Sequence, residues 1–181
     1  MQEFCKENGI HYLAGGAVDI NGLVIGGTGM WYNTPKGSDV DFWKRTMNDS
    51  SLIMTHKPQT FMYGYGASTT MNGFDTQEFY LSEVEKLKSI GKVDVLMTHV
   101  CPIIIPDRYM PREYHGDPAN MFYSSDNSAI IKSINPEIVI FGHTHDQYDM
   151  TVDGTWFACN PLGYKGEKSG NEILQIEIVK D

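Results

Sequence analysis

The sequence predicts an α/β fold in which a sheet is flanked by helices and extended by antiparallel hairpins. The first observation is a helix–strand–helix–strand alternation between residues 76 and 141, because such an alternation builds a sheet covered by helices. The second is a pair of tight-turn signals, Asn-Gly and Asp-Gly, each set between two apolar runs. The length of 181 residues, with 41% hydrophobic side chains, fits a single domain over residues 1–181 with its own core.

The first third of the chain predicts a helix, a hairpin and a second helix. Residues 1–8 are expected to be helical and to end at Gly9, since glycine tolerates the positive φ found just after helices. Residues 17–20 and 23–25 are expected to pair around their Asn-Gly turn. Residues 38–48 place apolar side chains on one helical face, and the serine at the start of this segment is suited to cap it.

The middle of the chain predicts a loop followed by the clearest helix. Residues 51–54 are either a short strand or a continuation of the preceding helix. Residues 57–74 are rich in Gly, Thr, Met and Tyr without periodicity, so we expect a long loop. In residues 76–90 apolar side chains recur at helical spacing, and residues 93–98 have the composition of a buried strand.

The last third predicts another helix, a strand, a hairpin and a closing strand. Residues 126–134 are expected to be helical and to be stopped by a proline, and residues 137–141 form the next apolar strand. Residues 148–152 and 155–159 flank Asp-Gly and predict the second hairpin. Residues 172–179 alternate apolar and polar side chains and predict a final strand.

The charge balance bears on the partners that the protein can have. The chain has 14 Lys and Arg against 23 Asp and Glu, a formal net charge of −9. Non-specific nucleic-acid binding is therefore not expected, since it depends on basic side chains that neutralise phosphates. An enzyme that meets phosphate through bound metal cations stays compatible with this charge, because the cations invert the local electrostatics.

The cysteines and the apolar runs indicate in which compartment the protein is expected. Cys5, Cys101 and Cys159 are an odd number at wide spacing, without a C-x-x-C pair, so we expect a reducing, cytoplasmic environment. The first residues lack the apolar core of a signal peptide. No apolar run approaches the length of a membrane-spanning helix, so no membrane partner is expected.

Three histidines follow predicted strands, at the places where open α/β sheets bind their ligands. His99 follows one apolar strand, and Gly142, His143 and His145 follow the next. On extended backbone His143 and His145 would lie on one side of the chain, and Gly142 would let the backbone turn. Neutral imidazole is a common ligand of zinc, iron and manganese-class ions, so the three histidines predict a metal site.

The remaining histidines and two polar loop residues have simpler interpretations. A lone histidine at a strand end is more often a hydrogen-bonded structural residue than a ligand, and only the combination of three favours a metal site. His11, His56 and His115 lack this context and are expected to be structural or surface residues. Asn160 and Tyr164 can approach the same edge, although a turn role is favoured for both.

Four segments of the sequence form a recognisable combination. They are Thr98-His99, Gly142-His143-Thr144-His145, Asn160-Pro161-Leu162-Gly163-Tyr164 and Gly166-Glu167. Together they resemble the calcineurin-like metallophosphoesterases, and the resemblance runs from about Ile10 to the end of the chain. It implies a two-sheet sandwich with helices outside and two metal ions at the strand ends.

The resemblance also implies a role for each histidine. His99 and His143 would bind the second metal ion, and His145 would bind the first. The ions of such enzymes are manganese, iron or zinc, and they activate a hydroxide that attacks the phosphorus of a phosphoester. Substrates of the family include phosphoproteins, nucleotides, nucleic acids and other phosphodiesters, and the sequence does not choose among them. No further catalytic residue is assigned.

Three earlier motifs of the family, D-x-H, G-D-x-x-D and G-N-H-[DE], do not occur in the sequence. In the family they supply carboxylate, amide and histidine ligands, and a histidine that helps to protonate the leaving group. We therefore expect residues 1–181 to be the C-terminal part of a metallophosphoesterase domain, starting at an internal or truncated Met1. This chain alone should hold at most one ion and have little phosphatase activity.

The missing motifs also leave a structural expectation and two alternatives. The strands that carry them would be absent, so sheet edge and apolar surface should be exposed. A separate chain that supplies these motifs would repair both defects. The alternatives are a non-catalytic remnant of the fold and a mononuclear metal-binding protein that uses the three histidines.

Overall fold

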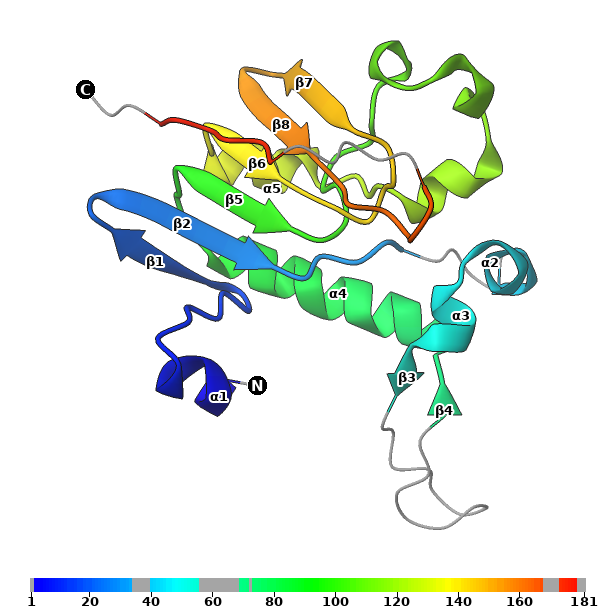
Figure 1. Ribbon diagram of the computed structural model, residues 1–181, viewed down its shortest axis with the longest axis horizontal. Helices are drawn as coiled ribbons and strands as arrows, with labels where there is room; N and C mark the ends of the chain where they lie inside the picture. Colours follow the sequence, from blue (N-terminus) through cyan, green and yellow to red (C-terminus); the bar gives the residue numbers. More distant parts are fainter. Residues whose placement is uncertain (1, 34–39, 56–68, 72, 168–172, 179–181) are drawn as a thin grey trace.

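The computed structural model describes five stretches of the chain, which are residues 2–33, 40–55, 69–71, 73–167 and 173–178. Its fold is α/β, as predicted, with a mixed six-stranded sheet (Figure 1). The strands of that sheet are β1 Gly16–Ile20, β2 Leu23–Thr28, β5 Val95–Thr98, β6 Ile138–Ile140, β7 Tyr148–Val152 and β8 Thr155–Cys159. Their order in the sheet is β1-β2-β5-β6-β8-β7. A separate ladder pairs β3 Met54–Thr55 with β4 Thr69–Thr70.

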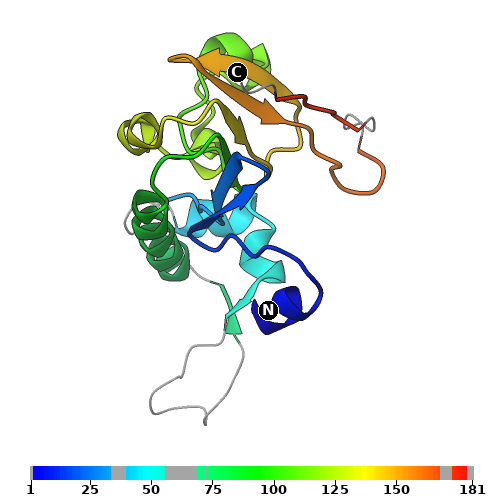
Figure 2. The ribbon, with the colours of Figure 1, turned by 90° about the vertical axis from the view of Figure 1, so that its left-hand side faces the viewer.

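Helices α4 Gly73–Ser89 and α5 Ser128–Ile134 cover one side of this sheet (Figure 2). The other α-helices of the described residues are α1 Gln2–Glu7, α2 Val40–Thr46 and α3 Asp49–Leu52. Three short 3-10 helices follow β5, namely η1 Asp107–Tyr109, η2 Arg112–Tyr114 and η3 Pro118–Phe122. The helices α4 and α5 lie on one side of the sheet, whereas residues 173–178 run along the other (Figure 2). None of the helices described is both long and apolar enough to cross a membrane.

Both predicted hairpins are confirmed. Strand β1 pairs antiparallel with β2, and β7 pairs antiparallel with β8. The first turn places Asn21 at φ 55° and Gly22 at φ 87°. The second places Asp153 at φ 50° and Gly154 at φ 85°. Two successive positive φ values match the right-handed twist of the flanking strands, and Gly, Asn and Asp adopt them most readily.

The helix-covered face of the parallel strands β2, β5, β6 and β8 forms the main core. Leu96 and Val139 are registered neighbours on this face with 0% exposure, and they belong to one cluster with Leu87 of α4. Gly26 is in register with Leu96, and a Cβ there would lie 2.7 Å from a methyl group of Ile90. A glycine is therefore required for the end of α4 to approach β2 closely.

The opposite face of the same strands is less completely covered. Met97, which follows Leu96 on β5, is 43% exposed. Its registered neighbours are Ile140, which is half-buried, and Gly27, which faces Leu13. We refer to Leu13, Gly27, Met97 and Ile140 as the open face. It presents apolar surface at the centre of the sheet.

A second, smaller core lies next to the carboxyl end of β5. Its buried members are Tyr32, Trp43, Met47, Met71, Val100 and Phe122. The indole N–H of Trp43 donates to the Tyr32 hydroxyl at 2.7 Å, and this hydroxyl donates to the carboxylate of Asp49 at 2.7 Å. These bonds tie α2 and α3 to the segment that follows β2.

Two boundaries differ from the prediction. Helix α4 begins at Gly73 rather than at residue 76, and Asp75 in its first turn has the charge that the helix dipole favours there. Residues 173–178, predicted as part of a strand, form none, and Ile173 is 95% exposed. An alternating pattern gives a strand only where a neighbouring strand completes its hydrogen bonds, and these residues pair with none of the described strands.

Other predictions are refined or cannot be placed. Residues 51–54 contain both of the alternatives, because α3 ends at Leu52 and β3 begins at Met54. The proposed helix cap Ser38, His56 and most of the predicted loop 57–74 lie outside the described residues.

Candidate metal centre

The carboxyl ends of β5 and β6 meet at one edge of the sheet, and this edge carries the candidate site. The two strands are parallel neighbours. Beyond their ends, the N–H of Gly142 donates to the carbonyl of His99 at 2.9 Å. The N–H of His99 donates to the carbonyl of Gly29, just after β2, also at 2.9 Å. Backbone hydrogen bonds therefore tie both histidine-bearing loops to the sheet.

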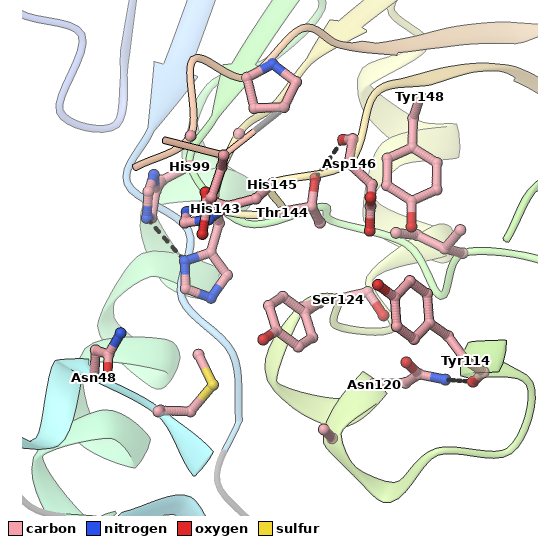
Figure 3. A pocket seen from close by; sticks show the side chains of 18 of the residues that line it. Asn48, His99, Tyr114, Asn120, Ser124, His143, Thr144, His145, Asp146 and Tyr148 are labelled. Atoms are coloured by element: carbon pink, nitrogen blue, oxygen red, sulfur yellow. Dashed lines mark hydrogen bonds and ion pairs between the residues drawn. The ribbon is translucent and has the colours of Figure 1, made fainter. Parts of the chain in front are cut away.

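His99 and His143 lie against each other (Figure 3). Nε2 of His99 is 3.2 Å from Nδ1 of His143. On its other side, Nε2 of His143 is 3.1 Å from the carbonyl oxygen of Phe122, which can only accept a hydrogen bond. This contact assigns the His143 proton to Nε2, so Nδ1 presents a lone pair to His99. Trp31 stacks on the His99 ring, with the ring centroids 5.7 Å apart.

The separation of the two nitrogens matches a hydrogen bond in which Nε2 of His99 donates to Nδ1 of His143, and it also matches two ligands of one cation. Two imidazole nitrogens that each lie about 2.0–2.1 Å from a tetrahedral zinc ion are roughly 3.3 Å apart, and the observed separation of the two histidine nitrogens is 3.2 Å. Ligating histidines usually donate their other N–H to a carbonyl or carboxylate, as His143 does to Phe122. Across the described residues, however, no group of three or more His, Cys, Asp or Glu side chains is arranged to hold a metal. The pair therefore supplies two ligands, and an ion there would need others from water, substrate or another chain.

The surroundings keep both imidazoles neutral. His99 is exposed on its pocket side, but partial desolvation of its ring lowers its pKa against the opposing effect of Asp49. Burial, and then repulsion from His99, hold the pKa of His143 well below its ordinary value. Neutral imidazole is the form that binds a metal, so no proton on Nδ1 of His143 has to be displaced at neutral pH.

His145 is held separately. It is 39% exposed, and its Nδ1 is 2.7 Å from a carboxylate oxygen of Glu167, which is 43% exposed. The ring of Tyr164, for which a turn role was favoured, packs edge-on against His145 with the centroids 4.5 Å apart. Within the described residues His145 shares no hydrogen bond with His99 or His143. The structure brings two of the three predicted ligands into contact and places the third on the same pocket wall.

The backbone turn that separates His143 from His145 differs from the expectation. The N–H of Thr144 donates to the carbonyl of Gly142 at 2.8 Å, and the residue between them, His143, has φ 67°. This is a three-residue γ-turn with positive φ, a rare conformation for a residue with a side chain. The backbone is therefore not extended as expected, and the turn is centred on His143 rather than on Gly142.

The three histidines line a cavity of about 920 Å³. Figure 3 shows His99, His143 and His145 on one side of it and Tyr114 and Asn120, from the 3-10 helices, on the other. Its acidic lining residues are Asp49, Asp117, Asp146 and Glu167. Among the described lining residues there is no lysine or arginine. The cavity is large enough for a drug-sized ligand, and its charge favours cations over anions.

Several lining residues were not found from the sequence. Asn48 and Asp49 come from the start of α3, and Asn120 and Tyr123 come from the region of η3. None of them belongs to a recognisable motif or follows a predicted strand. Asp49 is held at this wall by a hydrogen-bond chain from the buried Trp43 of α2 through the Tyr32 hydroxyl, a contact that only the tertiary structure reveals.

Comparison with known proteins does not assign the chain to a group. No family model matches it, and no curated protein matches it.

Proposed function

We propose that this chain is part of a metal-dependent phosphoester hydrolase of the calcineurin-like type. The observation that carries the proposal is the His99–His143 pair. Two neutral imidazoles, 3.2 Å apart, lie beyond the carboxyl ends of adjacent parallel strands, and the proton of one is fixed by a backbone carbonyl. This arrangement suits a divalent cation, and it coincides with the T-H and G-H-x-H motifs of the family.

The charge of the cavity supports the same proposal. A phosphoester brings negative charge to a wall that carries Asp49, Asp117, Asp146 and Glu167, with no described lysine or arginine to balance it. Bound cations would supply that balance. We therefore propose two divalent ions in the complete site, manganese, iron or zinc. His99 and His143 would hold one of them and His145 would contribute to the other.

The described residues have distinct tasks in this proposal. When bound, such ions supply Lewis acidity, which activates water and neutralises charge at phosphorus. His99 and His143 bind, with the second kept in one tautomer by Phe122. The 3-10 helices wall the cavity opposite them and give room for the ester group of the substrate, whose identity the lining does not specify.

We further propose that a separate chain completes the site. It would supply the D-x-H, G-D-x-x-D and G-N-H motifs and pack against the open face, giving the second sheet of a sandwich. The support is the exposure of Met97, 43%, beside the half-buried Ile140 at the centre of a sheet whose other face is covered by α4 and α5. Apolar surface in that position is typical of a contact with another polypeptide.

The other partner and location proposals rest on charge and cysteines. The net charge of −9 disfavours non-specific binding of nucleic acid. Cys5, Cys101 and Cys159 are buried free thiols, which supports a reducing, cytoplasmic location.

A mononuclear metal-binding protein is the second candidate. One observation favours it: His145 makes its contacts with Glu167 and Tyr164, whereas His99 and His143 already face each other. In that case one ion would be held by the pair, and no hydrolysis would follow from adding the missing motifs.

Calorimetric titration with Zn²⁺ tests the metal site first. We expect one ion per chain, and we expect His143→Ala to weaken its binding by about 100-fold or more, since loss of an outer-shell partner alone costs 10–100-fold. The exposed His11 is the control, and His11→Ala should bind as the unaltered chain does. Absence of binding, or equal binding by the His143 variant, would overturn the proposal.

Hydrolysis of p-nitrophenyl phosphate with Mn²⁺ then separates the two candidates. The chain alone should be nearly inactive. A polypeptide that carries the three missing motifs should raise the rate and the number of bound ions from one to two. An unchanged rate and one ion would favour the mononuclear protein, and robust hydrolysis by the chain alone would contradict its incompleteness.

A further inference from the structure

We propose that Glu167 is a positioning residue for His145. Its carboxylate accepts the proton on Nδ1 of His145 and so keeps Nε2 unprotonated and available to a cation at the cavity wall. The inference rests on the proposed function for the cation, but its structural part, the control of one tautomer by one carboxylate, is independent of it.

Glu167 is held beside His145 by contacts within its own segment. One of its oxygens, Oε2, is 2.7 Å from Nδ1 of His145 and accepts the backbone N–H of Tyr164 at 2.7 Å. The same oxygen is therefore held in place by the chain that bears it. The Tyr164 ring packs edge-on against the imidazole at a centroid distance of 4.5 Å, so the ring is fixed from a second direction.

The acceptor chemistry of a carboxylate determines which nitrogen of His145 would carry the proton. A carboxylate only accepts hydrogen bonds, so in our proposal Nδ1 of the neutral His145 ring carries the proton that faces Glu167. In the neutral ring Nε2 then keeps its lone pair. A histidine that donates to a carboxylate through one nitrogen and binds a cation through the other is a common pairing in metal sites, where the carboxylate fixes the tautomer and raises the basicity of the ligand.

His143 and His145 are alike in having an acceptor close to one ring nitrogen. Nε2 of His143 lies 3.1 Å from the carbonyl oxygen of Phe122, and Nδ1 of His145 lies 2.7 Å from the Glu167 carboxylate. Both His145 and Glu167 are more than a third exposed, and such a contact contributes little to folding. The contact is therefore better explained by orientation of the imidazole than by stability, and its removal should leave the fold intact.

The experiment is nitrogen NMR of the imidazoles in ¹⁵N-histidine-labelled, metal-free protein at a pH where His145 is neutral. The unaltered chain should show His145 protonated on Nδ1. Glu167→Ala should shift it mainly to the Nε2-protonated form, which predominates in free histidine. Glu167→Gln should retain the Nδ1-protonated form, because the amide oxygen accepts the same bond. Glu85→Gln, which removes another exposed carboxylate that is paired with a nearby cation, is the control and should change nothing.

Titration with Zn²⁺ on the same samples tests the link to the cation. Zinc should shift the His145 nitrogens in the unaltered chain, and Glu167→Ala should raise the concentration required by roughly 10–100-fold. An unchanged tautomer in Glu167→Ala would overturn the inference, while the His143 titration described above could still support the proposed function. Zinc that shifts His99 and His143 but leaves His145 unmoved in the unaltered chain would also overturn it.

Discussion

His143 and His145 are separated by one residue, yet the fold holds them in different ways. His143 donates to a backbone carbonyl of η3 and lies against His99, beside the buried aromatic residues of the smaller core. Nδ1 of His145 lies 2.7 Å from the side chain of Glu167, and its ring packs on Tyr164, which is 51% exposed. One histidine is fixed by the core, and the other is fixed by a surface segment near the end of the chain.

The two halves of the proposed site therefore depend on different parts of the structure. The His99–His143 half follows from the sheet, because parallel neighbouring strands bring their carboxyl ends together and buried aromatic residues fill the space behind them. The His145 half depends on the loop from residue 160 to residue 167. We therefore expect changes in the core to affect stability and the first half together, and changes in the loop to affect only the second half.

Phe122→Ala should have the largest effect and tests the core side of the comparison. Phe122 is fully buried, with its ring 5.6 Å from that of Tyr32. Truncation leaves a cavity against Tyr32, whose ring lies 5.4 Å from that of His143, so the free energy of unfolding should fall by about 3–5 kcal/mol. Tyr164→Ala is the matched change on the loop side and should cost less than about 1 kcal/mol. Urea unfolding followed by tryptophan fluorescence measures both. Equal losses would show that the two histidines are held by equally buried structure.

Much of the fold could be predicted because it depends on local patterns. The two hairpins were placed correctly, since Asn21-Gly22 and Asp153-Gly154 determine their turns within two residues. The pattern of residues 172–179 misled because a strand requires a partner, and periodicity does not report whether one is present. The start of α4 was placed three residues late, since helix ends fray and capping signals are weak.

The site could be predicted only as far as it follows from strand ends. The closeness of His99 and His143 could be predicted because each follows an apolar strand, and the two strands are neighbours. The approach of Asp49 depends on how α3 packs, and the separation of His145 depends on one φ value at His143. Neither tertiary packing nor a strained dihedral leaves a signature in a single sequence.

Glu83→Gln should have an intermediate effect and tests what holds His99. The Glu83 carboxylate, on α4, accepts the Thr28 hydroxyl and, at 3.1 Å, the N–H of Met30, on either side of the Gly29 carbonyl that receives His99. Burial alone would raise its pKa, but hydrogen bonds from Lys86 and Thr28 outweigh burial and hold the pKa below its usual value. We expect a loss of about 1–2 kcal/mol at pH 7, since hydrogen bonds to a charged group are removed.

The effect of Glu83→Gln on stability should depend on pH. Because the pKa of Glu83 is lower in the folded than in the unfolded chain, its contribution to stability is complete above the unfolded pKa and disappears as the pH falls through the folded one. The difference in unfolding free energy between the unaltered chain and Glu83→Gln should therefore shrink below about pH 4.5. Glu85→Gln is the control, since Glu85 pairs with Lys88 at the same spacing but is 74% exposed. A constant difference across this range would contradict an ionised, hydrogen-bonded Glu83.

Gly142→Ala should have the smallest effect, and it tests where the loop turns. A Cβ at residue 142 would lie no closer than 3.8 Å to the carbonyl oxygen of His99, which is ordinary contact, and the positive φ belongs to His143. Because alanine loses less backbone freedom on folding than glycine, the change should alter the free energy of unfolding by less than about 1 kcal/mol. Zn²⁺ binding by the His99–His143 pair should be unchanged. A large loss of stability or of Zn²⁺ binding would show that the loop requires a glycine at residue 142. The different placement of the two histidines would then depend on Gly142 rather than on the strained turn at His143.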